Sequence, residues 1–236
     1  MSARNRRGEP DDTTHLPDLQ QGITLCSTDA TVDSAIHALA VDHVLLSGGE
    51  AVWIDPGTHA QTGPLAELAP SDRILDRIRV ARGFTAFQHL EALRSLPGLV
   101  TRETSLVVVP QLDRYYRADS LLADEGTEML LSGIASLATV AREQDVAVLV
   151  TRARDDEFSA PIETAADHTL TCESTPFGPR FRADDEETLV YPVDGGRWVQ
   201  TTLSFWTDIL AAREPLYESS QAQPNTIQGV SIRGSN

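Results

Sequence analysis

Two short, almost uninterrupted apolar runs constrain the fold of this chain more than any other feature of its sequence. One covers residues 105–109 (SLVVV) and the other covers residues 146–150 (VAVLV). Strands that are buried on both faces of a parallel sheet have this composition. Between the runs, Leu130, Ile134 and Leu137 recur at the spacing of an amphipathic helix. The order strand, helix, strand predicts a parallel α/β sheet.

The flanking sequence extends this pattern in both directions. Upstream, strands are expected at 23–27, 51–55 and 77–82, each followed by turn residues or a helical pattern. One of these helices is expected to carry Phe84, Phe87, Leu90 and Leu93. After His168, four alternating segments separated by turn residues indicate antiparallel strands, at 168–175, 180–184, 187–193 and 196–202. The predicted fold is a three-layer α/β core, with a mostly parallel central sheet flanked by helices and a C-terminal antiparallel β-meander.

Both ends of the chain lack periodic apolar residues. Residues 1–20 are interpreted as a flexible arm, 21–214 as the core domain, and 215–236 as a flexible polar tail. No apolar run approaches the ~20 residues that span a bilayer, so a cytoplasmic protein is expected. Cys26 and Cys172 are far apart and are interpreted as buried small apolar side chains.

The charge balance excludes several classes of function. The chain has 19 basic and 35 acidic residues, a formal net charge of -16, and no lysine. Without a lysine amine, neither the phosphate contact of a P-loop nor a Schiff base can form. The acidic surface repels nucleic acid at long range. Such a composition is typical of proteins from salt-loving archaea, where concentrated salt screens the carboxylates.

Five strings along the chain resemble the ATPase core of archaeal RadA and RadB proteins in the RecA superfamily. They are 35–41 (AIHALAV), 51–55 (AVWID), 73–85 (RILDRIRVARGFT), 109–117 (VPQLDRYYR) and 146–151 (VAVLVT). The resemblance extends over about residues 21–205, and the string at 73–85 is the most specific match. It implies a RecA-like core without the helix-hairpin-helix domain of full-length recombinases.

The same resemblance implies that the ATPase machinery has been lost. The positions that carry the family's phosphate-binding, magnesium-binding, catalytic and phosphate-sensing groups are occupied here by Cys26, Thr31, Val32, Asp33, Gly57, Pro110 and Ala153. A P-loop needs glycines, a lysine and a Ser/Thr that binds Mg²⁺, and none stands at its place. Asp29 and Asp33 would also repel phosphates. We therefore expect no ATP hydrolysis, no catalytic residues, no cofactor and no metal.

Other polar groups were considered as a second active site. They are His37, His43 and His59 with Asp55, and Asp113 beside Tyr115 and Tyr116. None of these sets forms a spaced motif with a nucleophile or a metal. The aromatic residues Trp198, Phe205 and Trp206 are interpreted as core residues, with a partner site as the alternative.

Three functions are compatible with such a chain. The first is a non-catalytic paralogue that binds a RadA-type recombinase or a related paralogue in DNA recombination or repair, with Leu16 and Leu19 as candidate anchors on a partner-binding arm. The second is weak or indirect binding of single-stranded DNA or a partner through Arg114, Tyr116, Arg117, Arg152 and Arg154, which lie among acidic neighbours. The third is a SulA-like regulator that inhibits a division or other partner by direct contact. Homo- or hetero-oligomers are compatible with the first.

Overall fold

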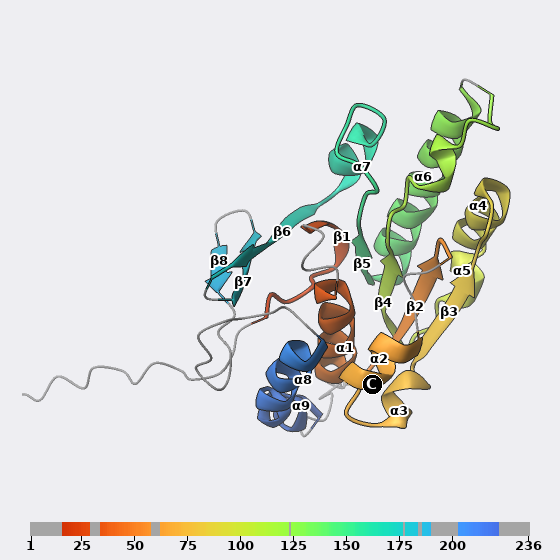
Figure 1. Ribbon diagram of the computed structural model, residues 1–236. Helices are drawn as coiled ribbons and strands as arrows, with labels where there is room; N and C mark the ends of the chain where they lie inside the picture. Colours follow the sequence, from red (N-terminus) through yellow and green to blue (C-terminus); the bar gives the residue numbers. More distant parts are fainter. Residues whose placement is uncertain are drawn as a thin grey trace, which may run out of the picture.

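One eight-stranded sheet forms the centre of the structure (Figure 1). This computed structural model describes residues 16–28, 34–57, 62–122, 124–176, 178–183, 186–189 and 203–221. The strands are β1 (Gly22–Thr28), β2 (Glu50–Asp55), β3 (Ile78–Arg82), β4 (Thr104–Val109), β5 (Ala147–Val150), β6 (His168–Thr175), β7 (Gly178–Ala183) and β8 (Glu186–Leu189). Their order across the sheet is β3-β2-β4-β5-β1-β6-β7-β8.

The direction of the strands confirms the predicted fold class. The pairs from β3 through β2, β4, β5 and β1 to β6 are all parallel. The pairs β6–β7 and β7–β8 are antiparallel. The chain is thus an α/β protein whose parallel sheet is extended by antiparallel strands near its C-terminal end.

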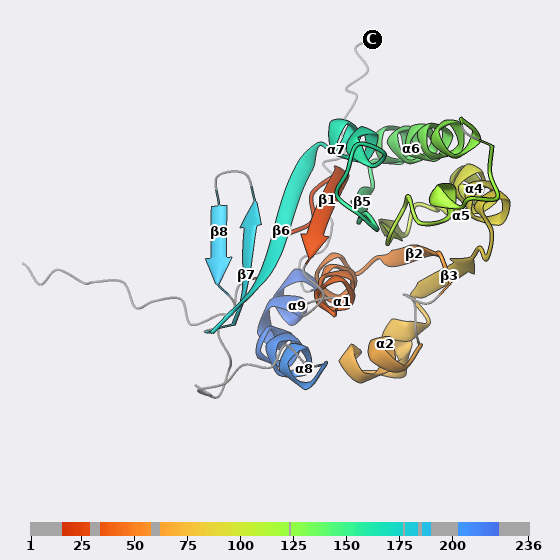
Figure 2. The same ribbon diagram turned by 45° about the horizontal axis from the view of Figure 1, so that its top comes forward.

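Helices cover both faces of the sheet (Figure 2). They are α1 (Ala35–Ser47), α2 (Thr62–Leu68), α3 (Asp72–Leu75), α4 (Ala86–Arg94), α5 (Leu96–Leu99), α6 (Glu125–Gln144), α7 (Ala160–Ala165), α8 (Leu203–Ala212) and α9 (Glu214–Gln221), with a 3₁₀ turn η1 (Tyr115–Arg117). Successive side chains of a strand point to opposite faces. In β4, Leu106 and Val108 join the core under α1, whereas Val107 and Val109 join the core under α6. The apolar runs of the sequence are therefore buried on both sides.

Helix α1 is apolar around most of its circumference because it lies between the sheet and other helices. Its buried residues contact the sheet on one side, and α2, α8 and α9 pack on its other sides. The helix ends at Gly48, which has a φ of 67°, the left-handed conformation that glycine adopts without strain. Because α8 and α9 pack against α1, this helix holds the C-terminal helices on the core.

A buried ion pair joins α1 to the C-terminal helices. The guanidinium of Arg213 donates to both carboxylate oxygens of Asp42, at 2.7 and 3.1 Å. The hydroxyl of Tyr217 donates to the same carboxylate at 2.6 Å. Burial and the neighbouring Asp42 carboxylate raise the pKa of Tyr217, so the hydroxyl remains a donor at neutral pH. We call Asp42, Arg213 and Tyr217 the C-terminal clasp.

The structure differs from the expected arm and tail at both ends. Leu16 and Leu19 are buried in the core under α1, 5% and 9% exposed. Helix α9 continues past residue 215, and its Tyr217 is buried. The sequence did not indicate either feature because the contacts that order both segments come from distant parts of the chain. The rest of the expected arm and tail lies outside the described residues, as do the strand expected at 196–202 and Trp198.

Two aromatic residues also differ from expectation. Phe84 lies before α4 and not on it, and Phe84 and Phe87 are 64% and 62% exposed, whereas Leu90 and Leu93 of the same helix are buried. Phe205 and Trp206 lie on a helix, α8, and are buried in the core. In the part of the chain that the structure describes, no helix is both long and apolar enough to cross a membrane.

Candidate functional site

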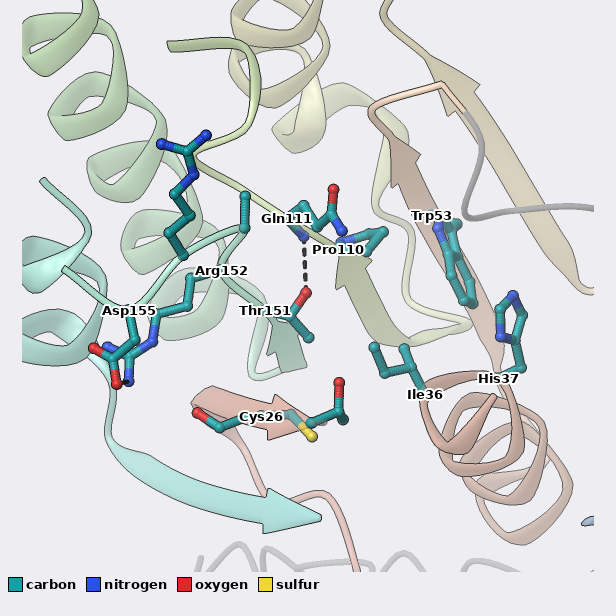
Figure 3. A pocket seen from close by; sticks show the side chains of 13 residues that line it. Cys26, Ile36, His37, Trp53, Pro110, Gln111, Thr151, Arg152 and Asp155 are labelled. Atoms are coloured by element: carbon teal, nitrogen blue, oxygen red, sulfur yellow. Dashed lines mark hydrogen bonds and ion pairs between the residues drawn. The ribbon is translucent and has the colours of Figure 1, made fainter. Parts of the chain in front are cut away.

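A cavity of about 440 Å³ lies at the carboxyl ends of the central strands (Figure 3). Residues 26–28 at the end of β1, Trp53 of β2, 110–111 after β4 and 151–155 after β5 line it, together with Ile36 and His37 in the first turn of α1. Ligands of open α/β sheets bind at this edge, outside the carboxyl ends of the strands. The volume lies in the range of pockets for small molecules.

Three of the seven positions singled out by the resemblance meet at this cavity. Cys26, Pro110 and Ala153 all line it, although they are far apart in the sequence. Gly57 lies after β2, where a Cβ atom would come within 3.0 Å of the Tyr115 hydroxyl. Thr31, Val32 and Asp33 lie outside the described residues.

The described side chains at the cavity include a neutral thiol, paired charged groups and a hydrogen-bonded hydroxyl. Burial raises the pKa of the Cys26 thiol to about 12, so the sulfur is a neutral thiol at physiological pH. Arg152 forms ion pairs with Asp155 at 2.7 Å and with Glu163 at 3.1 Å. The Thr151 hydroxyl accepts a hydrogen bond from the Gln111 backbone. The described lining offers hydrogen-bond donors and apolar surface, and it holds neither an activated nucleophile nor a lysine.

An aromatic pair forms one wall of the cavity. The rings of His37 and Trp53 are stacked with their centroids 5.3 Å apart. Figure 3 shows this pair on one side and Arg152 with Asp155 on the opposite side. Trp53 is fully buried, and its indole nitrogen has no acceptor among the described residues. The Nε atom of Arg152 is also buried without an acceptor there.

The loops after β4 and β5 are joined by their own ion pairs. The Nε atom of Arg117 donates to Asp113, and the two terminal nitrogens donate to Asp156 at 2.8 and 2.7 Å. The guanidinium also lies over the Phe158 ring, 4.7 Å from its centroid. Hydrogen bonding to Arg117 lowers the pKa of Asp156 to about 2, so this carboxylate stays ionised. Asp113 in turn accepts from the Ala153 backbone at 2.6 Å, which fixes the loop at the cavity.

Most residues proposed to contact DNA or a partner are engaged within the chain. Arg117 and Arg152 form the ion pairs described above, and Arg114 donates to the Gln111 side chain at 2.9 Å. Tyr116 is 2% exposed and shares a 2.8 Å hydrogen bond with His89. Arg154 forms no ion pair with the described residues and lines the cavity. Of this set, Arg114 and Arg154 therefore form no ion pair with the described residues, and the other members are held by partners within the chain.

The other polar groups considered from the sequence are not brought together. His37 stacks on Trp53, His43 bonds the Ser105 carbonyl at 3.1 Å, and His59 lies outside the described residues. Asp55 is buried and forms an ion pair with Arg82 at 3.2 Å. Among the described residues, no three His, Cys, Asp or Glu side chains are placed to hold a metal ion.

Sequence reasoning did not single out Trp53 or His89. Trp53 stands inside a predicted strand, where a buried aromatic residue is the ordinary expectation. His89 lies on α4, fully buried beside Tyr116 of η1, and burial lowers its pKa to about 4. Its Nε2 atom has no hydrogen-bond partner among the described residues. The only sign of His89 in the sequence is a histidine at an apolar position of the expected helix. This sign does not show that one of its ring nitrogens lacks a hydrogen-bond partner.

Comparison with protein-family models gives no match for this chain, and a search among curated proteins gives no significant match.

Proposed function

We propose that this chain is a non-catalytic RadA/RadB-like paralogue that binds a RadA-type recombinase or a related paralogue, as an accessory factor in DNA recombination or repair. It acts through protein contact and does not hydrolyse ATP. The observation that carries the protein-binding part of the proposal is an exposed strand edge with apolar side chains beside it. The resemblance of the five strings to RadA and RadB supports the class of partner.

Strand β3 ends the sheet on the side away from β8. It pairs with β2, and no other described strand pairs with its outer edge. An unpaired edge can accept an extended segment of another chain, with main-chain hydrogen bonds supplying the affinity. Arg79 and Arg82 of this strand are tied to Glu50 and Asp55, at 3.0 and 3.2 Å. Charged side chains of this kind restrict nonspecific pairing at the edge.

Exposed apolar side chains lie on β3 and in the segment that follows it. The exposed large apolar residues of the described chain are Val80, Phe84, Phe87, Leu122 and Leu131. Three of them, Val80, Phe84 and Phe87, fall on β3 or between it and the first turn of α4. Val80 pairs with Trp53 and therefore points to the α1 face of the sheet, opposite α4, so we call only Phe84 and Phe87 the edge patch. Exposed aromatic side chains that cluster are typical of protein interfaces, because their burial on binding stabilises the complex.

The backbone holds the edge patch in place without the partner. Thr85 caps α4 by accepting from the Gln88 backbone at 3.2 Å, and the Gln88 side chain accepts from the Phe84 backbone at 3.0 Å. Gly83 packs so closely on α4 that a Cβ atom would lie 2.6 Å from the His89 nitrogen. The two phenylalanines are therefore presented on a pre-formed turn, which reduces the entropy lost on binding.

The test is co-elution of the tagged chain with the RadA-type recombinase of the same cell in molar KCl. The double variant Phe84→Ser/Phe87→Ser is expected to weaken this complex by about a hundredfold or more, because aromatic anchors carry most of an interface's binding energy. The measurement is the dissociation constant from biolayer interferometry.

Leu131→Ser is the matched control, since it removes a 48% exposed apolar side chain from α6. It should leave the affinity within about threefold, as contacts outside the central patch are nearly neutral. The proposal fails if the wild-type chain does not bind the recombinase, or if the double variant binds as tightly as the wild type.

A further inference from the structure

We infer that the cavity at the carboxyl ends of β1, β2, β4 and β5 is a binding site for a small planar organic carboxylate. This site is separate from the edge patch, and no residue of the edge patch lines it. The inference rests on the unpaired donors, the charge and the aromatic wall of the cavity.

The first observation is a pair of buried N–H groups that need acceptors. The Trp53 side chain is 0% exposed, and its indole nitrogen finds no partner among the described residues. The Nε atom of Arg152 is also buried without an acceptor among the described residues, although its terminal nitrogens bind Asp155 and Glu163. Buried donors in native proteins almost always have a partner, and leaving one unmade costs about 1–3 kcal/mol. Both residues line one cavity, and the acceptor oxygens of a bound ligand are the partners that we infer for these donors.

The second observation is the local charge. Two carboxylates, Asp155 and Glu163, offset the charge of Arg152. Arg154 also lines the cavity and forms no ion pair with the described residues, although its charge helps to lower the pKa of Asp156. The first turn of α1, with Ile36 and His37 at the cavity, adds the positive end of the helix dipole. The lining thus offers a ligand carboxylate one guanidinium that has no ion pair within the described chain, that of Arg154. It does not suit a triphosphate, whose several negative charges would require a lysine or magnesium ligands.

The third observation is the shape of the wall. The stacked rings of His37 and Trp53 present a flat face, and His37 is the half-buried member of the pair. The base is formed in part by the neutral thiol of Cys26, and the hydroxyls of Ser27 and Thr28 add donors. The planar part of the ligand would lie against the imidazole, with its carboxylate towards the donors. The cavity of about 440 Å³ has room for such a ligand.

The experiment follows the indole N–H of Trp53 directly. The chain has three tryptophans, so a spectrum of the ¹⁵N-labelled protein contains three indole signals, and Trp53→Phe identifies one of them. The probes are benzoate and nicotinate, with the neutral amides benzamide and nicotinamide as matched controls. A saturable downfield shift of the Trp53 signal by a carboxylate is expected, because an acceptor then binds the N–H. The amides should bind at least about tenfold more weakly, because they lack the charge.

Two variants test which groups of the cavity bind the carboxylate. Trp53→Phe keeps an aromatic ring but removes the N–H, and it should weaken carboxylate binding about five- to tenfold in ligand-observed NMR. Arg154→Gln changes an exposed residue that need not affect folding. It should weaken carboxylate binding by a similar factor and leave the binding of the amides unchanged.

The inference is overturned if millimolar carboxylates leave the Trp53 signal unmoved, if the amides bind equally well, or if neither variant weakens binding. These outcomes would not affect the edge patch, which is tested separately through Phe84 and Phe87.

Discussion

Replacing Arg213 with methionine is expected to lower the free energy of unfolding by about 3–5 kcal/mol, the typical cost of removing one partner of a buried ion pair. Arg213 and Asp42 are 4% and 3% exposed, with their charged groups 2.7 Å apart. Without the guanidinium, the Asp42 carboxylate keeps only the Tyr217 hydroxyl as a partner within the clasp. The measurement is urea unfolding in molar KCl, followed by circular dichroism.

Two further variants test whether the unpaired charge is the cause. Arg142→Met removes an exposed arginine from α6 and should change the free energy of unfolding by less than about 0.5 kcal/mol. The triple variant Asp42→Leu/Arg213→Met/Tyr217→Phe replaces the whole clasp by apolar groups, and it should return to within about 1–2 kcal/mol of the wild type. If the triple variant is less stable than Arg213→Met alone, the clasp does not act as an ion pair.

Lowering the pH from 6.5 to 4 is expected to remove about 3 kcal/mol of stability through His89 alone. Burial lowers the pKa of His89 from 6.5 to about 4, against a smaller opposing effect of Asp55. Between these values the unfolded chain binds a proton that the folded chain does not, so stability falls as the pH falls. A shift of one pKa unit corresponds to about 1.4 kcal/mol. Below about pH 4 this contribution should level off.

The pH effect of His89 is isolated by comparing variants. His89→Gln should lose this part of the slope between pH 6.5 and 4, measured as the difference in free energy of unfolding from the wild type. Tyr116→Phe removes the 2.8 Å hydrogen bond but leaves the imidazole buried, and it should keep the slope. An unchanged slope in His89→Gln would show that other groups cause the pH dependence.

The sheet was predictable from the sequence because its signals are local. The apolar runs at 105–109 and 146–150 could only be strands buried on two faces, and the structure has β4 and β5 there. The change to antiparallel strands after His168 was also visible, because polar and apolar residues alternate there between turn residues. These strands correspond to β6, β7 and β8.

The parts that sequence reasoning missed depend on distant contacts. Helix α9 is polar in composition, and it is held by a clasp whose Asp42 lies more than 170 residues from Arg213. Phe84 and Phe87 fit the spacing of a buried helix face, but the helix begins at Ala86 and buries Leu90 and Leu93 instead. Both errors arise because local pattern does not specify which neighbours cover a segment.

The candidate site was predictable in position but not in detail. Counting along the resemblance selected Cys26, Pro110 and Ala153, which line one cavity. The unpaired donors of Trp53 and Arg152 could not be inferred, because a missing hydrogen-bond acceptor is a property of the surroundings.

We propose that this chain combines an α/β core with the absence of the groups that hold nucleotide. This proposal is tested most directly by calorimetric titration of the folded protein with ATP and Mg²⁺ in molar KCl, together with the Tm of the same sample. We predict no heat of binding and an unchanged Tm at every ATP concentration. A ligand that binds the folded state raises the Tm as its concentration increases. Magnesium-dependent binding heat with such a rise in Tm would contradict the account.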